Sequence, residues 1–197
     1  SCGYPGQVAQ TYDDGPHETI TPTILDALQS AQAKLTFFWL GSLIQSYKAI
    51  AQRAAREGHH LASHSWSHPD LTTLGPADLA NEVLWTEQQI KDVVGMRPRY
   101  FRPPYGSISR GVYNYVTNRG YRVILWNLDT FDWQFGVGPE HILNTYTTTL
   151  AGTARTKSYI SLQHDIQLKS GSIAKATVDA IRSQGFAVVP VYICLNE

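Results

Sequence analysis

The sequence predicts an α/β fold, a distorted (β/α) barrel with about seven parallel strands, in a single domain over residues 1–197. Two observations lead to this prediction. Short runs rich in β-branched and aromatic residues alternate with longer helical patterns, and strict alternation indicates a parallel sheet. Polar side chains also follow the carboxyl ends of several non-adjacent strands, and such ends converge more easily in a barrel than in an open sheet. We expect the barrel to be irregular because only seven strands are visible.

The predicted strands lie at residues 7–12, 34–40, 59–63, 99–101, 122–127, 158–163 and 187–193. Helices are predicted between them at residues 21–31, 47–58, 76–95, 110–120, 139–151 and 172–185. The first helix is predicted to start with Thr21 as N-cap and Pro22 at its first position, which proline favours. The longest helix has apolar residues near helical spacing, at Leu79, Val83, Ile90 and Val94.

The composition is that of a globular protein with an uncharged partner. Hydrophobic residues make up 43% of the chain, charged residues 16%, and the formal net charge is +0. Binders of nucleic acid or of anionic membranes usually carry a basic excess, so we expect neither partner. No apolar run approaches the ~20 residues that span a bilayer. We expect a monomer that binds a neutral polymer or a small molecule.

The two cysteines, Cys2 and Cys194, lie at opposite ends of the chain. Because the termini of a domain often lie close together, we predict a disulfide bond between them. A bridge that closes such a long loop would stabilise the fold by up to about 5 kcal/mol. Disulfides are typical of oxidising compartments, so the prediction includes a secreted protein, outside the cell or in the cell wall. Two unrelated thiols are the alternative.

Residues capable of acid–base chemistry or metal binding gather after the predicted strands. In chain order they are Asp13 and Asp14, His64 and His68, Arg102, Asp129 and Asp132, and His164 and Asp165. In a β/α barrel the carboxyl ends of the strands form one face, where active sites are built. We therefore expect these side chains to share one site.

The segment HSWSH at residues 64–68 holds two histidines four residues apart. They can face the same way if the backbone turns helically. Two histidines and a distant carboxylate form a three-ligand set suited to zinc, with a fourth position left for water. Taken alone, such a pair is typical of a protein surface, and its convergence with Asp13 and Asp14 favours the metal site.

The adjacent acids of TYDDGP (residues 11–16) are predicted to have two different roles. Neighbouring residues at a strand end point in different directions, so one carboxylate can bind a cation while the other stays free. Arg102, in the stiff segment RPPYG, can pair with the free aspartate and keep it ionised. A simple turn is the alternative for the isolated DDG sequence. His164, as a proton donor, needs its charged form stabilised, and Asp132 can supply that charge.

Five segments together resemble the motifs of the polysaccharide deacetylase family, which is also called carbohydrate esterase family four or the NodB homology domain. They are TYDDGP, HSWSHP, RPPYG, DTFDW and ISLQHD, in this order, within residues 8–193. The resemblance implies a distorted (β/α) barrel and a metal-dependent hydrolase that releases acetate. Tyr12 and Ser65 replace the more common phenylalanine and threonine, and neither is an implied ligand.

The resemblance also implies a role for each matching residue. Asp14, His64 and His68 would hold one divalent metal ion, with zinc the first expectation and cobalt the second. Asp13 would be the general base, oriented by Arg102. His164 would be the general acid, tuned by Asp132.

The same resemblance implies residues that contact the substrate. The backbone N–H of Tyr105 would help to bind the oxyanion, and Trp133 and Leu162 would wall the acetyl pocket. Trp66 and Trp133 are candidates for stacking on sugar rings. The terminal cysteines and the tryptophan-rich motifs look most like secreted fungal chitin deacetylases.

The expected substrates are acetylated polysaccharides or oligosaccharides, first of all chitin and chitooligosaccharides. Two alternatives on the same scaffold are an acetylxylan esterase and a peptidoglycan N-acetylglucosamine deacetylase. A catalytically inactive carbohydrate-binding module is an alternative of another class, although every implied catalytic position is filled.

Overall fold

The computed structural model describes residues 1–197 and contains a parallel sheet that closes into an irregular barrel. Its strands are β1 (Gln7–Ala9), β2 (Thr11–Asp13), β3 (Thr36–Trp39), β4 (His60–Ser63), β5 (Tyr100–Phe101), β6 (Arg122–Val123), β7 (Leu128–Asp129), β8 (Tyr159–His164) and β9 (Ala187–Val188). Their order is β6-β5-β4-β3-β2-β8-β1-β9, and β7 also pairs with β8. All the pairs are parallel, which confirms the predicted fold class.

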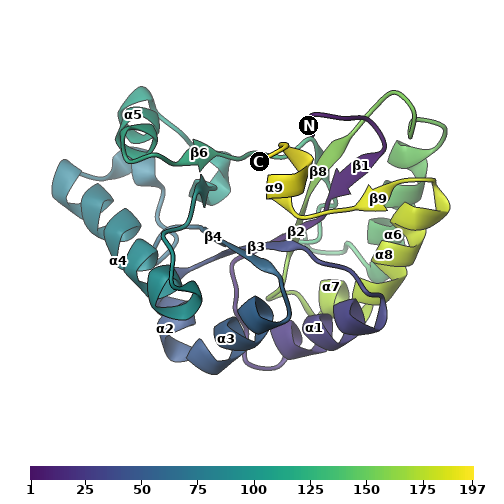
Figure 1. The fold of residues 1–197 in the computed structure, drawn as a ribbon, viewed down its shortest axis with the longest axis horizontal. Coiled ribbons are helices and arrows are strands. Elements are labelled where there is room, and N and C mark those ends of the chain that lie inside the picture. Colours follow the sequence, from purple (N-terminus) through teal and green to yellow (C-terminus); the bar gives the residue numbers. More distant parts are fainter.

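Helices surround the strands, as Figure 1 shows. They are α1 (Ile20–Ser30), α2 (Gly41–Ser46), α3 (Lys48–Arg56), α4 (Pro76–Val94), α5 (Arg110–Asn118), α6 (Pro139–Leu150), α7 (Leu168–Ser172), α8 (Ala174–Ser183) and α9 (Val191–Cys194). Two short 3₁₀ turns complete the fold, η1 (Leu71–Thr73) and η2 (Pro104–Gly106). None of these helices combines the length and the hydropathy that crossing a membrane requires.

Segment 122–129 closes the barrel. The prediction of one continuous strand over residues 122–127 is wrong, because the segment forms two short strands. Its first part, β6, pairs with β5, and its last part, β7, pairs with β8. Between β6 and β7 the backbone leaves the sheet. There the side chain of Asn127 makes hydrogen bonds to the backbone of β8 and of the residue before it, as a neighbouring strand would. Its Oδ1 accepts a hydrogen bond from the N–H of Ile160 (2.7 Å), and its Nδ2 donates to the carbonyl of Ser158 (3.2 Å).

Two other predicted elements need correction. The predicted strand 187–193 is only the two-residue β9 followed by α9, because Pro190 has no N–H for a sheet and instead precedes the helix. The predicted N-cap Thr21 lies inside α1, whose N-cap is Thr19. The hydroxyl of Thr21 is buried and donates to Asp165 Oδ2 (2.6 Å), so it connects the helix to the end of β8.

Alternating side chains of β3 face the two sides of the sheet, as a strand requires. Phe37 and Trp39 pack with the apolar faces of α1, α3 and α4, in the largest buried cluster. Phe38 belongs to a separate buried cluster, together with Ala62, Tyr100 and Cys194. In the longest helix, the predicted positions Leu79, Val83 and Ile90 are buried, so its register agrees with the predicted apolar face.

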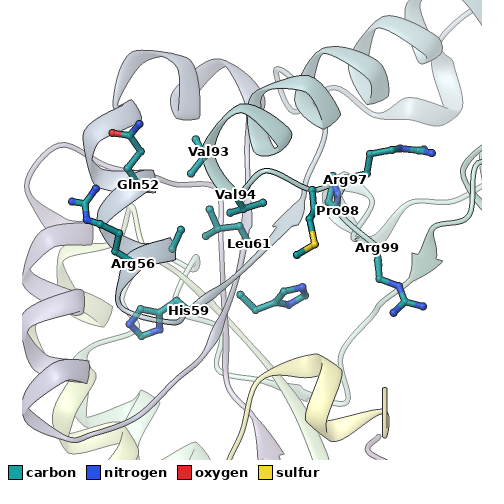
Figure 2. Close-up of a pocket in the computed structure, with 12 residues that line it drawn as sticks. Gln52, Arg56, His59, Leu61, Val93, Val94, Arg97, Pro98 and Arg99 are labelled. Atoms are coloured by element: carbon teal, nitrogen blue, oxygen red, sulfur yellow. The ribbon is translucent and has the colours of Figure 1, made fainter.

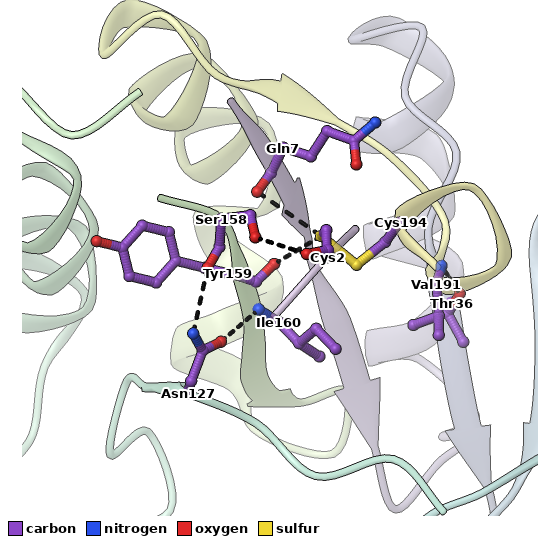
Figure 3. The surroundings of a disulfide bond; sticks show 9 residues. All are labelled: Cys2, Gln7, Thr36, Asn127, Ser158, Tyr159, Ile160, Val191 and Cys194. Atoms are coloured by element: carbon purple, nitrogen blue, oxygen red, sulfur yellow. Dashed lines mark hydrogen bonds between the residues drawn. A yellow bond between two sulfur atoms is a disulfide. The ribbon is translucent and has the colours of Figure 1, made fainter. Parts of the chain in front are cut away.

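The two ends of the chain meet at a disulfide bond between Cys2 and Cys194, as predicted (Figure 3). The two Cα atoms lie 4.4 Å apart, and the bond spans 192 residues of sequence. The backbone also joins there, since the N–H of Gly3 donates to the carbonyl of Cys194 (2.7 Å). The disulfide therefore fixes α9 next to the first strand.

A hollow of about 610 Å³ lies between α3, the start of β4 and the end of α4 (Figure 2). Arg56 and Arg99 line it together with His59 and His60. Burial lowers the pKa of both imidazoles to about 4, so they are neutral at pH 7. The group of side chains able to hold a metal lies elsewhere in the molecule.

Candidate active site

Most of the predicted site residues line one pocket of about 330 Å³ at the carboxyl ends of the strands, and Arg102 and Asp132 lie buried behind it in contact with Asp13 and His164. Asp13 ends β2, His64 follows β4, and His164 ends β8. The full lining is Asp13, Asp14, His64, His68, Tyr105, Trp126, Asp129, Trp133, Leu162 and His164. Parallel strands thus bring together motifs that are far apart in the sequence.

Asp14, His64 and His68 form a three-residue group with the geometry of a metal site. The Nε2 atoms of both histidines lie 3.2 Å from Asp14 Oδ1. The Nδ1 of His64 donates to the carbonyl of Arg102 (2.7 Å), so its Nε2 is left as the acceptor atom that a metal binds. Burial raises the pKa of Asp14, but the two imidazoles that face its carboxylate outweigh it and hold that pKa far below its ordinary value.

Several residues at this site have a backbone conformation that residues other than glycine rarely adopt. Five of the seven non-glycine residues with positive φ are on loops around the pocket: Asp14 (75°), Ser65 (70°), His68 (66°), Tyr105 (59°) and Phe131 (55°). Segment 64–68 is therefore an irregular loop, and its two histidines face the same carboxylate without the helical turn considered for them. Strained backbone of this kind persists where the surrounding structure holds it, often at functional sites.

Asp13 is held apart from the metal group by Arg102. The Nη1 of Arg102 donates to Asp13 Oδ1 (2.6 Å) and to the hydroxyl of Thr11 (2.7 Å). Arg102 is completely buried, and its guanidinium lies 4.0 Å from the ring centroid of Phe38. Burial lowers the pKa of this guanidinium, while the charge of Asp13 opposes that effect.

His164 is held by the buried carboxylate of Asp132. Its Nδ1 lies 2.7 Å from Asp132 Oδ1, and its backbone N–H donates to Oδ2 (2.7 Å). The hydroxyl of Ser170, on α7, also donates to Oδ2 (2.5 Å). Burial lowers the pKa of His164, but the hydrogen bond and the charge of Asp132 outweigh it and raise that pKa to about 9. The imidazole is therefore protonated at neutral pH, with Nε2–H facing the pocket residues.

A family model described as polysaccharide deacetylase matches residues 2–124. The chain belongs to the polysaccharide deacetylase family. The chain is 33% identical over 204 residues to a chitin deacetylase of Colletotrichum lindemuthianum, and the alignment covers 100% of this chain and 82% of that protein. The solved structure of the chitin deacetylase from the same fungus has a TM-score of 0.93 at 33% identity, covering 100% of this chain and 90% of that one.

A bacterial relative is similar to the same extent. The chain is 34% identical over 188 residues to a peptidoglycan-N-acetylglucosamine deacetylase of Listeria monocytogenes. That alignment covers 94% of this chain but only 38% of the relative, so the chain spans little more than a third of the relative's length. The predicted family and fold are confirmed, and the similarity is shared between fungal and bacterial members.

The residues predicted to contact the substrate do not all lie at the pocket. Trp133 and Leu162 line the pocket, with Trp133 half exposed. Tyr105 also lines it, and its ring packs against that of His68 (centroids 4.6 Å apart). Trp66 does not line the pocket, because its ring packs against Gly41 and against Trp85 on α4.

Several residues that support the site carry no clear signal in the sequence. Trp126 lines the pocket and donates its Nε1–H to Asp129 (3.2 Å), but in the sequence it looked like part of a strand. Ser170 and Glu82 lie on helices outside the five motifs, and only the hydrogen bonds of the folded chain reveal them. Gly15 is required because a Cβ there would overlap the carboxylate of Asp165.

Proposed function

We propose that the protein is a metal-dependent hydrolase that removes N-acetyl groups from N-acetylglucosamine polymers and releases acetate. The observation that carries the proposal is the meeting of a metal-capable triad and two tuned acid–base pairs around one pocket. The triad is Asp14, His64 and His68, and the pairs are Asp13 with Arg102 and His164 with Asp132. An inactive carbohydrate-binding module has no need of this combination.

The residues of the triad fit a divalent metal ion. Asp14 Oδ1 is a buried carboxylate oxygen with no hydrogen-bond partner other than the two imidazole nitrogens that face it. One carboxylate oxygen and two neutral imidazoles suit zinc first, and cobalt as a substitute. When bound there, the ion would polarise the acetyl carbonyl and make water acidic enough to be deprotonated near neutral pH.

Asp13 is proposed as the general base that takes a proton from the attacking water. The ion pair with buried Arg102 leaves one of its oxygens, Oδ2, facing the pocket side, 3.8 Å from His64 Nε2. Positive charge beside a carboxylate favours its ionised form, which is the form that a base requires. General-base catalysis of this kind contributes about 10²- to 10⁴-fold.

His164 is proposed as the general acid that protonates the departing sugar nitrogen through Nε2–H. Amide hydrolysis depends on this step, since an amine anion is a very poor leaving group. Asp132 holds the ring by Nδ1 and keeps it charged. The backbone N–H of Tyr105 would donate to the oxyanion, and Trp133 and Leu162 would enclose the acetyl methyl group.

Two polymers are equally supported as the substrate. The fungal relative is named a chitin deacetylase and the Listeria relative a peptidoglycan deacetylase, at 33% and 34% identity. Both polymers contain N-acetylglucosamine, and the half-exposed Trp133 offers an aromatic face for a sugar ring. Stacking on Trp66 would require its ring to leave the contact with Trp85. We propose a monomer that acts outside the cell or in the cell wall, which agrees with the disulfide between Cys2 and Cys194.

The test is acetate release from chitin oligomers, peptidoglycan and acetylated xylan by purified protein. We expect release from one of the two N-acetylglucosamine polymers, loss of activity with chelator and recovery with zinc. Asp13→Asn serves as a matched inactive control because it should still bind the metal. Release from acetylated xylan alone would favour an esterase, and binding to the polymers without any acetate release would overturn the proposal.

A further inference from the structure

The loop 64–68, which carries both histidines of the triad, is held on one side by the start of α2. The carbonyls of Ser65 and Trp66 accept hydrogen bonds from the backbone N–H groups of Gly41 (3.0 Å) and Ser42 (3.2 Å). The hydroxyl of Ser42 also donates to the carbonyl of Trp66 (2.7 Å). These contacts use the carbonyl groups of the loop and leave its N–H groups to be satisfied elsewhere.

Two successive N–H groups of the same loop point at a single carboxylate on α4. Glu82 Oε2 accepts from the N–H of Trp66 (2.8 Å) and from the N–H of Ser67 (2.9 Å). Glu82 Oε1 accepts from the hydroxyl of Ser67 (2.6 Å). Successive backbone N–H groups that converge in this way form a concavity suited to an anion, and here the anion is a side chain of the protein itself.

Glu82 has no other partner that would explain its position. It takes part in none of the ion pairs of the structure, and its carboxylate bonds only to residues 66 and 67. Glu87, one and a half turns further along α4, is a useful contrast. It binds Arg97, Arg119 and Tyr121 and so joins α4 to the α5 region.

We propose that Glu82 is a positioning residue of the metal site, which locks the loop 64–68 so that His68 reaches the ligand position opposite His64. This inference rests on the proposed metal-dependent function. His68 ends the loop in left-handed backbone (φ 66°), and its own N–H donates to Ser65 Oγ (3.1 Å), inside the loop. Without Glu82, the N–H groups of Trp66 and Ser67 would lose the acceptor that the fold gives them. The bonds from α2 to the loop carbonyls, the contact inside the loop and the hydroxyl of Tyr105 (3.3 Å to the His68 carbonyl) would then be left to oppose relaxation of the strained turn.

Loss of the Glu82 carboxylate is predicted to weaken metal binding, and to slow the reaction only as a consequence. A loop that samples several conformations must be ordered when the metal binds, so affinity falls by the cost of that ordering. Outer residues that orient metal ligands typically change metal affinity about 10- to 100-fold when removed. We expect Glu82→Ala to weaken zinc binding at least about tenfold.

The experiment compares wild-type protein, Glu82→Ala, Glu82→Gln and Glu87→Ala. Three quantities are measured for each protein. They are the zinc dissociation constant by chelator competition, the thermal stability of the metal-free state, and the rate of hydrogen exchange at the amides of Trp66 and Ser67. Glutamine can still accept both N–H groups through Oε1 and donate to the Ser67 hydroxyl, so it should recover most of the affinity. Glu87→Ala should lower the melting temperature and leave the zinc constant unchanged.

Each outcome decides a different point. Faster exchange at both amides with weaker zinc binding in Glu82→Ala, and recovery in Glu82→Gln, would support the inference. Wild-type affinity in Glu82→Ala would overturn it, as would an equal loss in Glu87→Ala, which would indicate a merely structural role. If Glu82→Ala does not fold, Glu82→Asp decides, since its shorter side chain withdraws the carboxylate from the loop, and unchanged zinc affinity there also overturns the inference. A wild-type protein that binds no zinc would instead count against the proposed function.

Discussion

The pair of His164 and Asp132 gives a prediction whose size can be derived from the structure. The pKa of His164 is about 9, against an ordinary value of 6.5. This difference corresponds to about 3 kcal/mol in favour of the protonated imidazole. Burial acts in the opposite direction, so the raising influences must together exceed this net amount; the hydrogen bond and charge of Asp132 are the largest of them, and the charges of Asp13 and Asp14 add to them. Replacing Asp132 by asparagine removes the charge and leaves the burial unchanged.

We therefore expect Asp132→Asn to lower the pKa of His164 to about 7 or below. At pH 8 the protonated fraction would fall from about 90% to about 10% or less, and amide hydrolysis would fall at least as much. The raised pKa also stabilises the fold. This contribution is complete below pH 6.5 and is lost as the pH rises through about 9, so Asp132→Asn should flatten the decline in stability between these values.

The measurement is an NMR titration of the histidine ring nitrogens in metal-free protein, with His164→Gln to identify the signal. Asp179→Asn, which removes an exposed carboxylate paired with Lys175 on α8, is the matched control and should leave the titration unchanged. A pKa for His164 that stays near 9 in Asp132→Asn would refute the argument, because it would show that another group holds the proton. Activated ester substrates should suffer less than amides, since their leaving groups need no proton.

The remaining predictions concern the other parts of the site and the disulfide. Asp13→Asn should keep stoichiometric zinc and lose about 10²- to 10⁴-fold in turnover, and a parallel loss of zinc and activity would argue against a separate base. His68→Ala should lose zinc, which elemental analysis of the purified protein would detect, and retained stoichiometric zinc would disprove its role as a ligand. Replacing Cys2 and Cys194 by serine should lower the free energy of unfolding by up to about 5 kcal/mol in urea titrations, and an unchanged midpoint would contradict the expected constraint.

Much of the fold could be predicted from the sequence because its elements are separated by strong local signals. The helix 76–95 was predicted to within one residue, with proline near its start and Gly95 in left-handed backbone after its end. Segment 122–127 was predicted as one strand, because nothing local reveals that the Asn127 amide replaces a strand partner. The strand 187–193 failed for a reason visible in the sequence, since Pro190 cannot supply the N–H that a longer strand needs.

The candidate site was predictable to the extent that its residues follow strand ends. Parallel strands bring such residues together whatever lies between them, so Asp14, His64 and His68 could be expected to meet. The conformation of loop 64–68 could not be predicted, since left-handed backbone at Ser65 and His68 depends on contacts from α2 and α4. For the same reason the roles of Glu82 and Ser170 could not be predicted, since neither residue belongs to a recognisable sequence motif.

The left-handed residues of the pocket loops set a limit on how far this protein can be made heat-resistant. Glycine adopts such backbone without the steric cost of a Cβ atom, so it would relax the strain at Asp14 or His68. Glycine cannot supply a carboxylate or an imidazole, so the substitution would abolish the proposed metal ligands at the same time. At Asp14 and His68, a substitution that stabilises the backbone would remove a proposed metal ligand. Substitutions intended to stabilise the fold should therefore be made at other positions.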